Sequence, residues 1–321
     1  MKHANIDFND AQQVATGFLM PAYYNVEATV YQTKYQAFDY ARYLPVITEG
    51  SEWARGVLFR SSDIAGKAEF LSGKGFDMPY ADVSRDQHLK GFELAGIGYE
   101  WSLEEVQTAA LEGRQLGNEK AMAARKVAEK RLWDIALTGA TEKNWTGLIN
   151  DGNVPAADVA ANGTGSATFW ATKTPDQILA DINSAITGIY TETKGTEIAD
   201  TLLLPSGVMD LLSSTRLTDT GMTTLAFLRQ NNAYTARTGQ PLLITEMFEL
   251  NTADPGGDGR AVVYARSPDV LRFHLPMPHK FLPPFQKSSM TWEVAGIMRT
   301  GGTEIRLPKA VRYMDGLIDN S

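Results

Sequence analysis

The chain contains no cysteine and only four histidines among its 321 residues. Disulfide bonds, thiolate metal sites and cysteine nucleophiles are therefore excluded. The histidines are His3, His88, His274 and His279, and none forms the i, i+4 pair of a zinc-binding helix. His274 and His279 lie in a Pro-rich stretch, where we expect a surface or packing role. The histidine pattern therefore predicts no metal site.

Long apolar runs are also missing. No stretch approaches the ~18 consecutive apolar residues that span a bilayer. Residues 1–5 carry no apolar core of a signal peptide. We therefore expect no membrane association, and we expect the protein to be made and kept in a cytoplasm.

An excess of positive charge is absent as well. The formal net charge is -8 and the sequence pI is about 5.1. Tight, sequence-independent binding of nucleic acid needs clustered Lys and Arg that replace counterions. This negative net charge suits a surface that faces nucleic acid without binding it tightly.

Motifs for catalysis and nucleotide binding are missing too. Gly73-Lys74-Gly75 lacks the upstream glycine, the Ser/Thr and the helix of a phosphate loop. No strand is followed by G-x-G-x-x-G, and G-x-S-x-G does not occur. Glu104 and Glu105 suit a helix first turn, and Asp254 and Asp258 suit a turn better than a calcium loop. We predict no catalytic, cofactor-binding or metal-binding residues.

Two segments in the first quarter of the chain have no clear hydrophobic core of their own, which suggests that another part of the assembly covers them. Residues 5–47 are polar with scattered aromatics and fit no single period, which indicates either an arm that packs on something else or an ordinary N-terminal subdomain. Residues 48–80 predict a long β-hairpin. Residues 53–60 alternate like a half-buried strand, residues 76–80 form a second extended run, and glycines lie between them. Few large apolar residues are present to cover the hairpin.

Residues 102–137 carry the strongest periodic signal and predict one long helix. Ser102 and Glu105 match a capping box, and Gly139 offers the C-terminal stop. At 1.5 Å per residue the helix would be roughly 54 Å long. A face of small residues predicts close packing on a sheet rather than a dimeric coiled coil. That face contains Leu103, Val106, Ala110, Gly113, Gly117, Ala121, Ala124, Ala128, Leu132 and Ile135.

The pattern after residue 172 is mixed α/β. Thr174-Pro175-Asp176 opens a helix, and residues 201–204 form a short buried strand that ends at Pro205. Shorter elements follow: helical pieces at 208–212 and 225–228, strands at 241–245 and 261–264, a strand at 290–298, a turn at Gly301-Gly302 and a return strand at 304–307.

The order of these parts resembles the Hong Kong 97 capsid fold of tailed bacteriophages, which is α+β. Residues 99–106 are similar to the family's strand and Ser-x-Glu-Glu start of the spine helix. Residues 137–139 with 147–150 look like the helix exit and its Gly-Leu-Leu-Asn loop. Residues 204–212 look like the axial strand and helix that follow a Pro. Residues 305–311 look like the last strand.

The resemblance covers residues 50 to 315 and implies a division of the chain. We expect an N-terminal arm (1–50), an extended hairpin loop with its return strand (51–98) and a peripheral domain (99–155) with a spine helix over 102–137. An axial α/β domain (156–281) and closing strands of the peripheral domain (282–321) complete it.

The resemblance implies a major capsid protein, and not an enzyme, that self-assembles as pentamers and hexamers into an icosahedral head around double-stranded DNA. It also implies a virion location, assembly in the host bacterial cytoplasm, a separate scaffolding protein because the arm is short, a portal and a possible decoration protein. We expect the group carrying domain of unknown function 2184. An encapsulin-type nanocompartment subunit and an α/β enzyme with an unrecognised pocket are the alternatives.

Some members of the family join a hairpin Lys to an Asn of a neighbour. Lys67, Lys74 and Asn320 are the candidates here. The alternative is that these lysines solvate an exposed loop or pair with acids of the next subunit. We favour that alternative and expect no cross-link.

Overall fold

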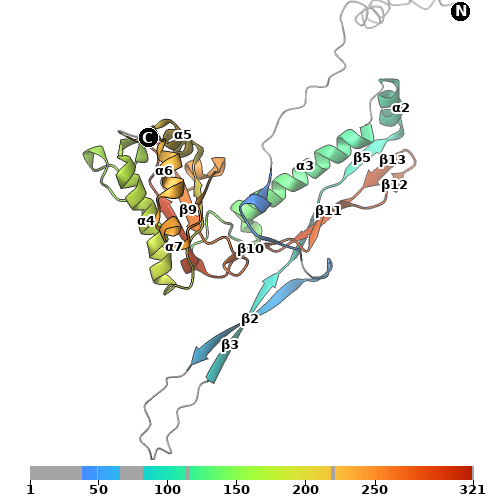
Figure 1. The fold of residues 1–321 in the computed structure, drawn as a ribbon. Helices are drawn as coiled ribbons and strands as arrows, with labels where there is room; N and C mark the ends of the chain where they lie inside the picture. Colours follow the sequence, from blue (N-terminus) through green and yellow to red (C-terminus); the bar gives the residue numbers. More distant parts are fainter. Residues whose placement is uncertain (1–37, 49, 66–81, 113–115, 218–220, 320–321) are drawn as a thin grey trace, which may run out of the picture. The chain divides into compact units, whose positions relative to one another are not determined.

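The computed structural model describes residues 38–48, 50–65, 82–112, 116–217 and 221–319 (Figure 1). Within them, a five-stranded mixed sheet has the order β6-β16-β9-β7-β8. Its strands β7 and β9 are wholly buried, which explains their continuous apolar sequence. The strands are β6 (Ala156–Asp158), β7 (Thr201–Leu204), β8 (Leu243–Glu246), β9 (Arg260–Tyr264) and β16 (Val311–Asp315).

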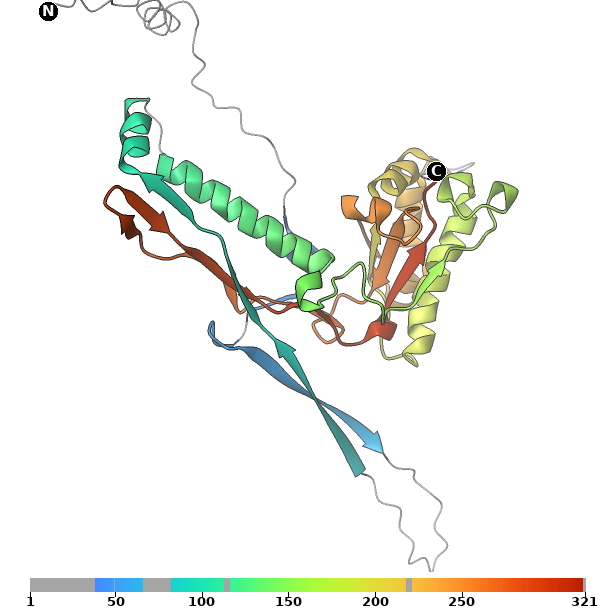
Figure 2. The same ribbon diagram turned by 180° about the vertical axis from the view of Figure 1, so that it is seen from behind.

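Four α-helices accompany this sheet (Figure 2). They are α4 (Pro175–Glu192), α5 (Ser206–Ser214), α6 (Thr224–Gln230) and α7 (Ala233–Thr238). The helix start predicted at Thr174-Pro175-Asp176 is confirmed: Pro175 occupies the first turn of α4, and Thr174 caps the helix in a capping box with Gln177. Ile182, Ile186 and Ile189 of α4 are fully buried and face the sheet at helical spacing.

The predicted long helix is two helices in the structure. α2 (Leu103–Leu111) ends at Glu112, and α3 (Leu116–Leu137) follows over 22 residues. The capping box of Ser102 and Glu105 is confirmed, but the single helix over 102–137 is wrong. The sequence between the two helices contains Gly113, and Gly117 follows, each of which disfavours a helix by about 1 kcal/mol relative to Ala.

Three further sheets, each of three strands, accompany α3. Their orders are β1-β10-β15, β11-β14-β4 and β12-β13-β5. The strands are β1 (Val46–Ile47), β4 (Glu93–Gly96), β5 (Tyr99–Ser102), β10 (Leu271–His274), β11 (Met277–Phe281), β12 (Phe285–Ser288), β13 (Thr291–Val294), β14 (Gly296–Thr300) and β15 (Gly302–Ile305). Short 3₁₀ turns are η1 (Tyr40–Arg42), η2 (Thr141–Lys143), η3 (Thr164–Ser166), η4 (Trp170–Thr172), η5 (Phe248–Thr252) and η6 (Pro308–Ala310).

The closing strands differ from the expectation in two ways. The strand expected over 290–298 is divided at Ala295 into β13 and β14, which join different sheets, and β15 pairs with β10 rather than returning along β14. The last strand, β16, pairs with β9 and β6 in the five-stranded sheet, so residues 311–315 do not extend the other sheets as the boundary at 282 implied. Which strands pair cannot be predicted from local sequence when the partners are far apart in the chain. This explains why the sheet partners of β13 to β15 and of β16 were not predicted.

The hairpin consists of β2 (Gly56–Ala65) and β3 (Asp82–Gly91), paired antiparallel along ten residue pairs from Gly56↔Gly91 to Ala65↔Asp82. The partner strand expected at 76–80 lies outside the described residues, and the strand that pairs with β2 begins later, at Asp82. Alternation is weak in β3, which is rich in charged and polar residues, and the sequence therefore did not reveal it.

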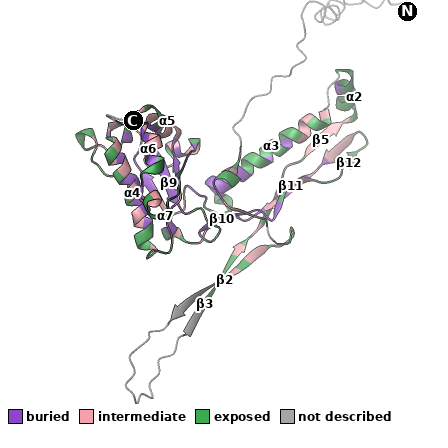
Figure 3. Cartoon of the chain, viewed as in Figure 1, coloured by how far each residue is buried: buried purple, intermediate pink, exposed green. Residues whose placement is uncertain are grey.

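A continuous hydrophobic core runs from the C-terminal half of α3 into the five-stranded sheet. Figure 3 shows buried residues concentrated in these places, while the hairpin is intermediate or exposed. Trp133 of α3 packs against Tyr43 at a ring distance of 5.7 Å and donates its Nε1–H to Glu249. None of the described hairpin residues belongs to this core.

Candidate assembly surfaces

One face of the hairpin carries an apolar pair that the chain leaves uncovered. Leu58 and Leu89 are direct cross-strand partners, and their exposed fractions are 51% and 76%. Direct partners share a face, so their side chains lie next to each other. The sequence-based expectation that the hairpin lacks its own cover is met at this pair.

The opposite face of the hairpin contacts the rest of the chain. Phe59 stacks on His88, its cross-strand partner, at a ring distance of 5.0 Å. The guanidinium of Arg306 lies 4.2 Å from the centre of the Phe59 ring. The two faces of the ribbon therefore differ: one touches the body of the subunit and the other is open.

A second exposed apolar patch lies where α2 meets the strands β12 and β13. The backbone N–H of Leu103 donates to the carbonyl of Met290 at 2.9 Å, which joins the two segments. Leu103 and Met290 are both exposed at this junction, and Val106 and Leu111 of α2 and Phe285 of β12 are further exposed apolar side chains on the joined segments, Leu111 at 90% and Phe285 at 70%. Clustered exposed apolar side chains of this kind mark interaction sites.

The exposed part of this patch corrects the predicted buried face. Leu103, Val106 and Ala110 were expected to be buried, but only Ala109 of α2 is. On α3 the expectation is confirmed for Ala124, Ala128, Leu132 and Ile135. The periodicity correctly identified an apolar side of α2, but the rest of the described chain covers Leu103 and Val106 only in part.

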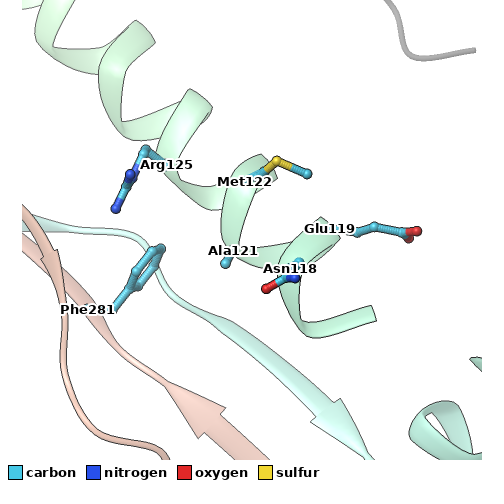
Figure 4. Close-up of a pocket in the computed structure, with 6 residues that line it drawn as sticks. All are labelled: Asn118, Glu119, Ala121, Met122, Arg125 and Phe281. Atoms are coloured by element: carbon cyan, nitrogen blue, oxygen red, sulfur yellow. The ribbon is translucent and has the colours of Figure 1, made fainter. Parts of the chain in front are cut away.

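A shallow hollow of about 570 Å³ lies between α3 and β11. Figure 4 shows Phe281 extending from β11 toward Ala121 and Arg125 on α3, while Glu119 points away. Ala121 is half-buried here, so the predicted small-residue face continues to this position but is only partly covered. The hollow has few titratable groups and they do not converge, which is unlike a catalytic pocket.

Buried charges elsewhere are paired. The ammonium of Lys173 lies 2.6 Å from Asp181 Oδ2, which also accepts from Trp170 Nε1 at 3.1 Å. Both charged side chains are almost fully buried. Asp181 lines a second hollow, of about 460 Å³, together with Arg312. Asp181 forms an ion pair with Lys173, and Arg312 forms one with Glu192. We therefore assign these charged groups a role in stabilising the fold.

His274 has the packing role that the sequence predicts. It is 3% exposed, and its Nε2 lies 2.8 Å from Glu304 Oε2. Burial alone would raise the pKa of Glu304, but the hydrogen bond with His274 and the charge of Arg306 lower it below its ordinary value. No local pattern indicates this pairing, because the two residues are 30 positions apart in the chain.

The acidic candidates also have structural positions. Glu105 accepts from the backbone of Ser102 and pairs with Lys120, which together lower its pKa. Asp254 accepts from the backbone N–H groups of Gly256 and Gly259, so the turn is confirmed. Lys67, Gly73, Lys74, Gly75 and Asn320 lie outside the described residues. Within the described ranges, no group of three or more acidic or histidine side chains could hold a metal, and no helix there is long and apolar enough to cross a membrane.

Solved structures with the same architecture come from bacteriophage shells and a related particle. The capsid of Myoviridae phage XM1 matches with a TM-score of 0.74 at 17% identity, covering 92% of this chain and 98% of that one. Microbacterium phage Oxtober96 matches with a TM-score of 0.61 at 11% identity over 95% and 99% of the two chains. The capsid of a native GTA particle matches with a TM-score of 0.61 at 11% identity over 92% and 95%. These likenesses establish the fold as the Hong Kong 97 capsid type.

The sequence itself matches the profile of the family described as major capsid protein over residues 66–317. A search of curated proteins gives no match. The narrower group with domain of unknown function 2184 is not confirmed and stays a prediction. The profile spans most of the chain, including the hairpin strand β3, α3 and the five-stranded sheet, and the fold agrees with it. The chain therefore belongs to the major capsid protein family and is a shell subunit of a tailed bacteriophage.

Proposed function

We propose that this subunit assembles as pentamers and hexamers into a closed icosahedral head around double-stranded DNA. Assembly in the host bacterial cytoplasm, a separate scaffolding protein, a portal and a possible decoration protein are parts of the same proposal. The subunit acts by packing alone and catalyses no reaction. Its net charge of -8 supports a surface that encloses DNA without binding it tightly, and the proposal includes no sequence-specific contact with the DNA.

The observation that carries the proposal is the exposed pair Leu58 and Leu89. Burying a leucine fully contributes about 1.5–3 kcal/mol. A two-stranded ribbon is marginal in water by itself. A neighbouring subunit that covers this face would supply the missing burial, so the stability of the hairpin would be coupled to assembly.

Replacing both leucines tests the proposal. Leu58→Asp with Leu89→Asp should prevent shell formation in negative-stain microscopy and sedimentation, because two carboxylates would enter the interface unpaired. The free subunit should melt as the parent does, since neither side chain is in its core. Asp86→Asn on the other face of β3 is the matched control and should assemble normally. Parental shell yield from the double variant would contradict the proposal.

The contents of purified particles separate the phage head from the nanocompartment alternative. A genome and a portal at one vertex are expected for a phage head, whereas an enclosed cargo protein would indicate a nanocompartment. Membership of the major capsid protein family supports the phage head.

A further inference from the structure

The root of the hairpin is its end nearest the paired glycines Gly56 and Gly91, and the body is the part of the chain that carries α3 and its sheets. Cations lying over aromatic rings attach the root to the body. Arg306 lies over Phe59 of β2 at 4.2 Å, and Arg299 lies over Trp53, just before β2, at 5.7 Å. Arg299 also donates through Nη1 to the carbonyls of Trp53 and Ala54 at 2.9 and 2.7 Å. In both contacts the body supplies the cation and the hairpin side supplies the ring.

In a third contact the hairpin supplies the cation and the body supplies the ring. Lys90 of β3 lies 5.6 Å from the ring centre of Trp145, in the loop after α3, and donates to the carbonyl of Thr303 at 3.2 Å. Burial lowers the pKa of Lys90, which agrees with its ammonium lying against the body. The hairpin root is therefore gripped from both of its strands.

The position of Arg306 is set from the core side. Its Nε donates to Glu304 Oε2 at 3.1 Å, and the same oxygen lies 2.8 Å from Nε2 of the buried His274. The guanidinium over Phe59 is thus held by a carboxylate that is itself fixed on the sheet containing β10 and β15.

The hairpin residues whose side chains are described are 56–59 and 85–91, and of their apolar members Val57 and Phe59 are half-buried. None of them is a member of the hydrophobic core. The ribbon itself is continuous, with ten paired positions. Its first pair is Gly56 and Gly91, and a side chain added at Gly91 would meet nothing within 4 Å. A side chain added at Gly56 would lie 2.6 Å from the carbonyl oxygen of Lys90, and Phe92 donates its N–H to the carbonyl of Arg55 at 2.8 Å, so the two strands stay closely paired down to the base of the ribbon.

We propose that Phe59, Lys90 and Trp53, with their partners Arg306, Trp145 and Arg299, form a releasable clasp that sets the angle of the hairpin. In the unassembled subunit the clasp is closed and the ribbon is held at one angle. Opening these individually weak, directional contacts lets the ribbon change its angle to the body as one piece while the core stays folded. A hairpin gripped by apolar burial would instead move only if the core opened.

Distance measurements between two spin labels test the clasp on the unassembled, full-length subunit. The chain has no cysteine, so Gln87→Cys on β3 and Thr138→Cys after α3 carry the only labels. The parent should give a narrow distance distribution. Combining Lys90→Met with Arg306→Leu removes both charges but keeps apolar stems, and it should broaden the distribution and shift its mean.

Three comparisons make the outcome decisive. Lys143→Met removes a lysine that pairs with Glu93 near the same loop and should leave the distribution narrow. Lys90→Arg with Arg306→Lys keeps both cations and should restore it. Thermal melting followed by tryptophan fluorescence should change little in every variant, and the two single variants serve if the double variant fails to fold. The clasp is overturned if the distance distribution of the variants that lack the Lys90 and Arg306 charges is the same as that of the parent, whether both are narrow or both are broad. Because no shell is formed in this experiment, its failure would leave the assembly proposal standing.

Discussion

Arg260 and Asp315 face each other directly across β9 and β16 and form a two-pronged ion pair. Nε donates to Oδ1 at 2.7 Å and Nη2 donates to Oδ2 at 2.8 Å, with both side chains more than nine-tenths buried. The remaining Nη1 donates to the carbonyl of Ile149 at 2.7 Å. The pair therefore ties the last strand of the chain to the five-stranded sheet and to the loop that leads into it.

Removing one partner of this pair should be strongly destabilising. Asp315→Ala leaves the Arg260 guanidinium buried and uncompensated, which costs about 3–5 kcal/mol. Urea unfolding of the free subunit measures the change. Arg260→Met combined with Asp315→Leu should recover part of the loss, and Lys143→Ala in the exposed pair with Glu93 should have little effect. Equal stability of Asp315→Ala and Lys143→Ala would contradict the assignment.

The buried face of α3 can be tested with one substitution at two adjacent positions. Ala124 is 5% exposed, whereas Ala123 is exposed. Ala124→Asp should block folding because its carboxylate would be buried without a partner. Ala123→Asp is the matched control and should be nearly neutral in denaturant melts, as should Lys126→Ala. Ala121→Asp should be milder than Ala124→Asp, since Ala121 is only half-buried. Similar unfolding midpoints for Ala123→Asp and Ala124→Asp would refute the assignment of the buried face of α3.

Glu304 should make the free subunit sensitive to acid. Its pKa in the folded protein lies below the ordinary value of 4.5, so the unfolded chain takes up the proton first as the pH falls. The contribution of Glu304 is therefore fully present above the ordinary pKa and is lost as the pH falls through the lower, folded value. Urea melts above and below this range should show a shallower pH dependence for Glu304→Gln. A parental pH dependence in that variant would exclude this role.

Hydrogen exchange should distinguish the hairpin in free subunits from the hairpin in shells. The ribbon has backbone pairing but an uncovered face, so its amides should exchange faster in the free subunit than in shells, where a neighbouring subunit would cover that face. The amides of β9 in the buried sheet provide the internal control and should be protected in both states. Equal protection of β2 and β3 in both states would mean that the hairpin needs no neighbour.

Mature particles should contain no covalent cross-link between subunits. The candidate residues Lys67, Lys74 and Asn320 lie outside the described residues, so the expectation still depends on the sequence. Boiling particles in denaturing gel buffer should release a single monomer band. A ladder of higher bands would support the cross-link, and Lys67→Arg or Lys74→Arg would then identify the lysine.

Local chemistry was sufficient to predict several elements from the sequence. The capping box of Ser102 and Glu105 that starts α2 requires only residues three apart, and the start of α4 at Thr174-Pro175-Asp176 is equally local; both are present. The apolar run of β7 ends at Pro205 as predicted. The small-residue side of α3 is buried from Ala124 to Ile135, because helical periodicity directly reflects which side is covered. The order of these elements was also enough to reveal the capsid fold, because each feature comes from neighbours along the chain.

Only the tertiary structure decided which strands pair and which surfaces stay open. β16 joins β9 through Arg260 and Asp315, residues 55 positions apart in sequence, and no local pattern marks such a partner. The exposure of Leu103 and Val106 on α2 was likewise hidden. An apolar stripe predicts that something covers it, but it does not say whether the same chain or another one does. The contact of Lys90 with Trp145 depends on strand β3 meeting the loop after α3 in space, and no local pattern in the sequence indicates such a contact.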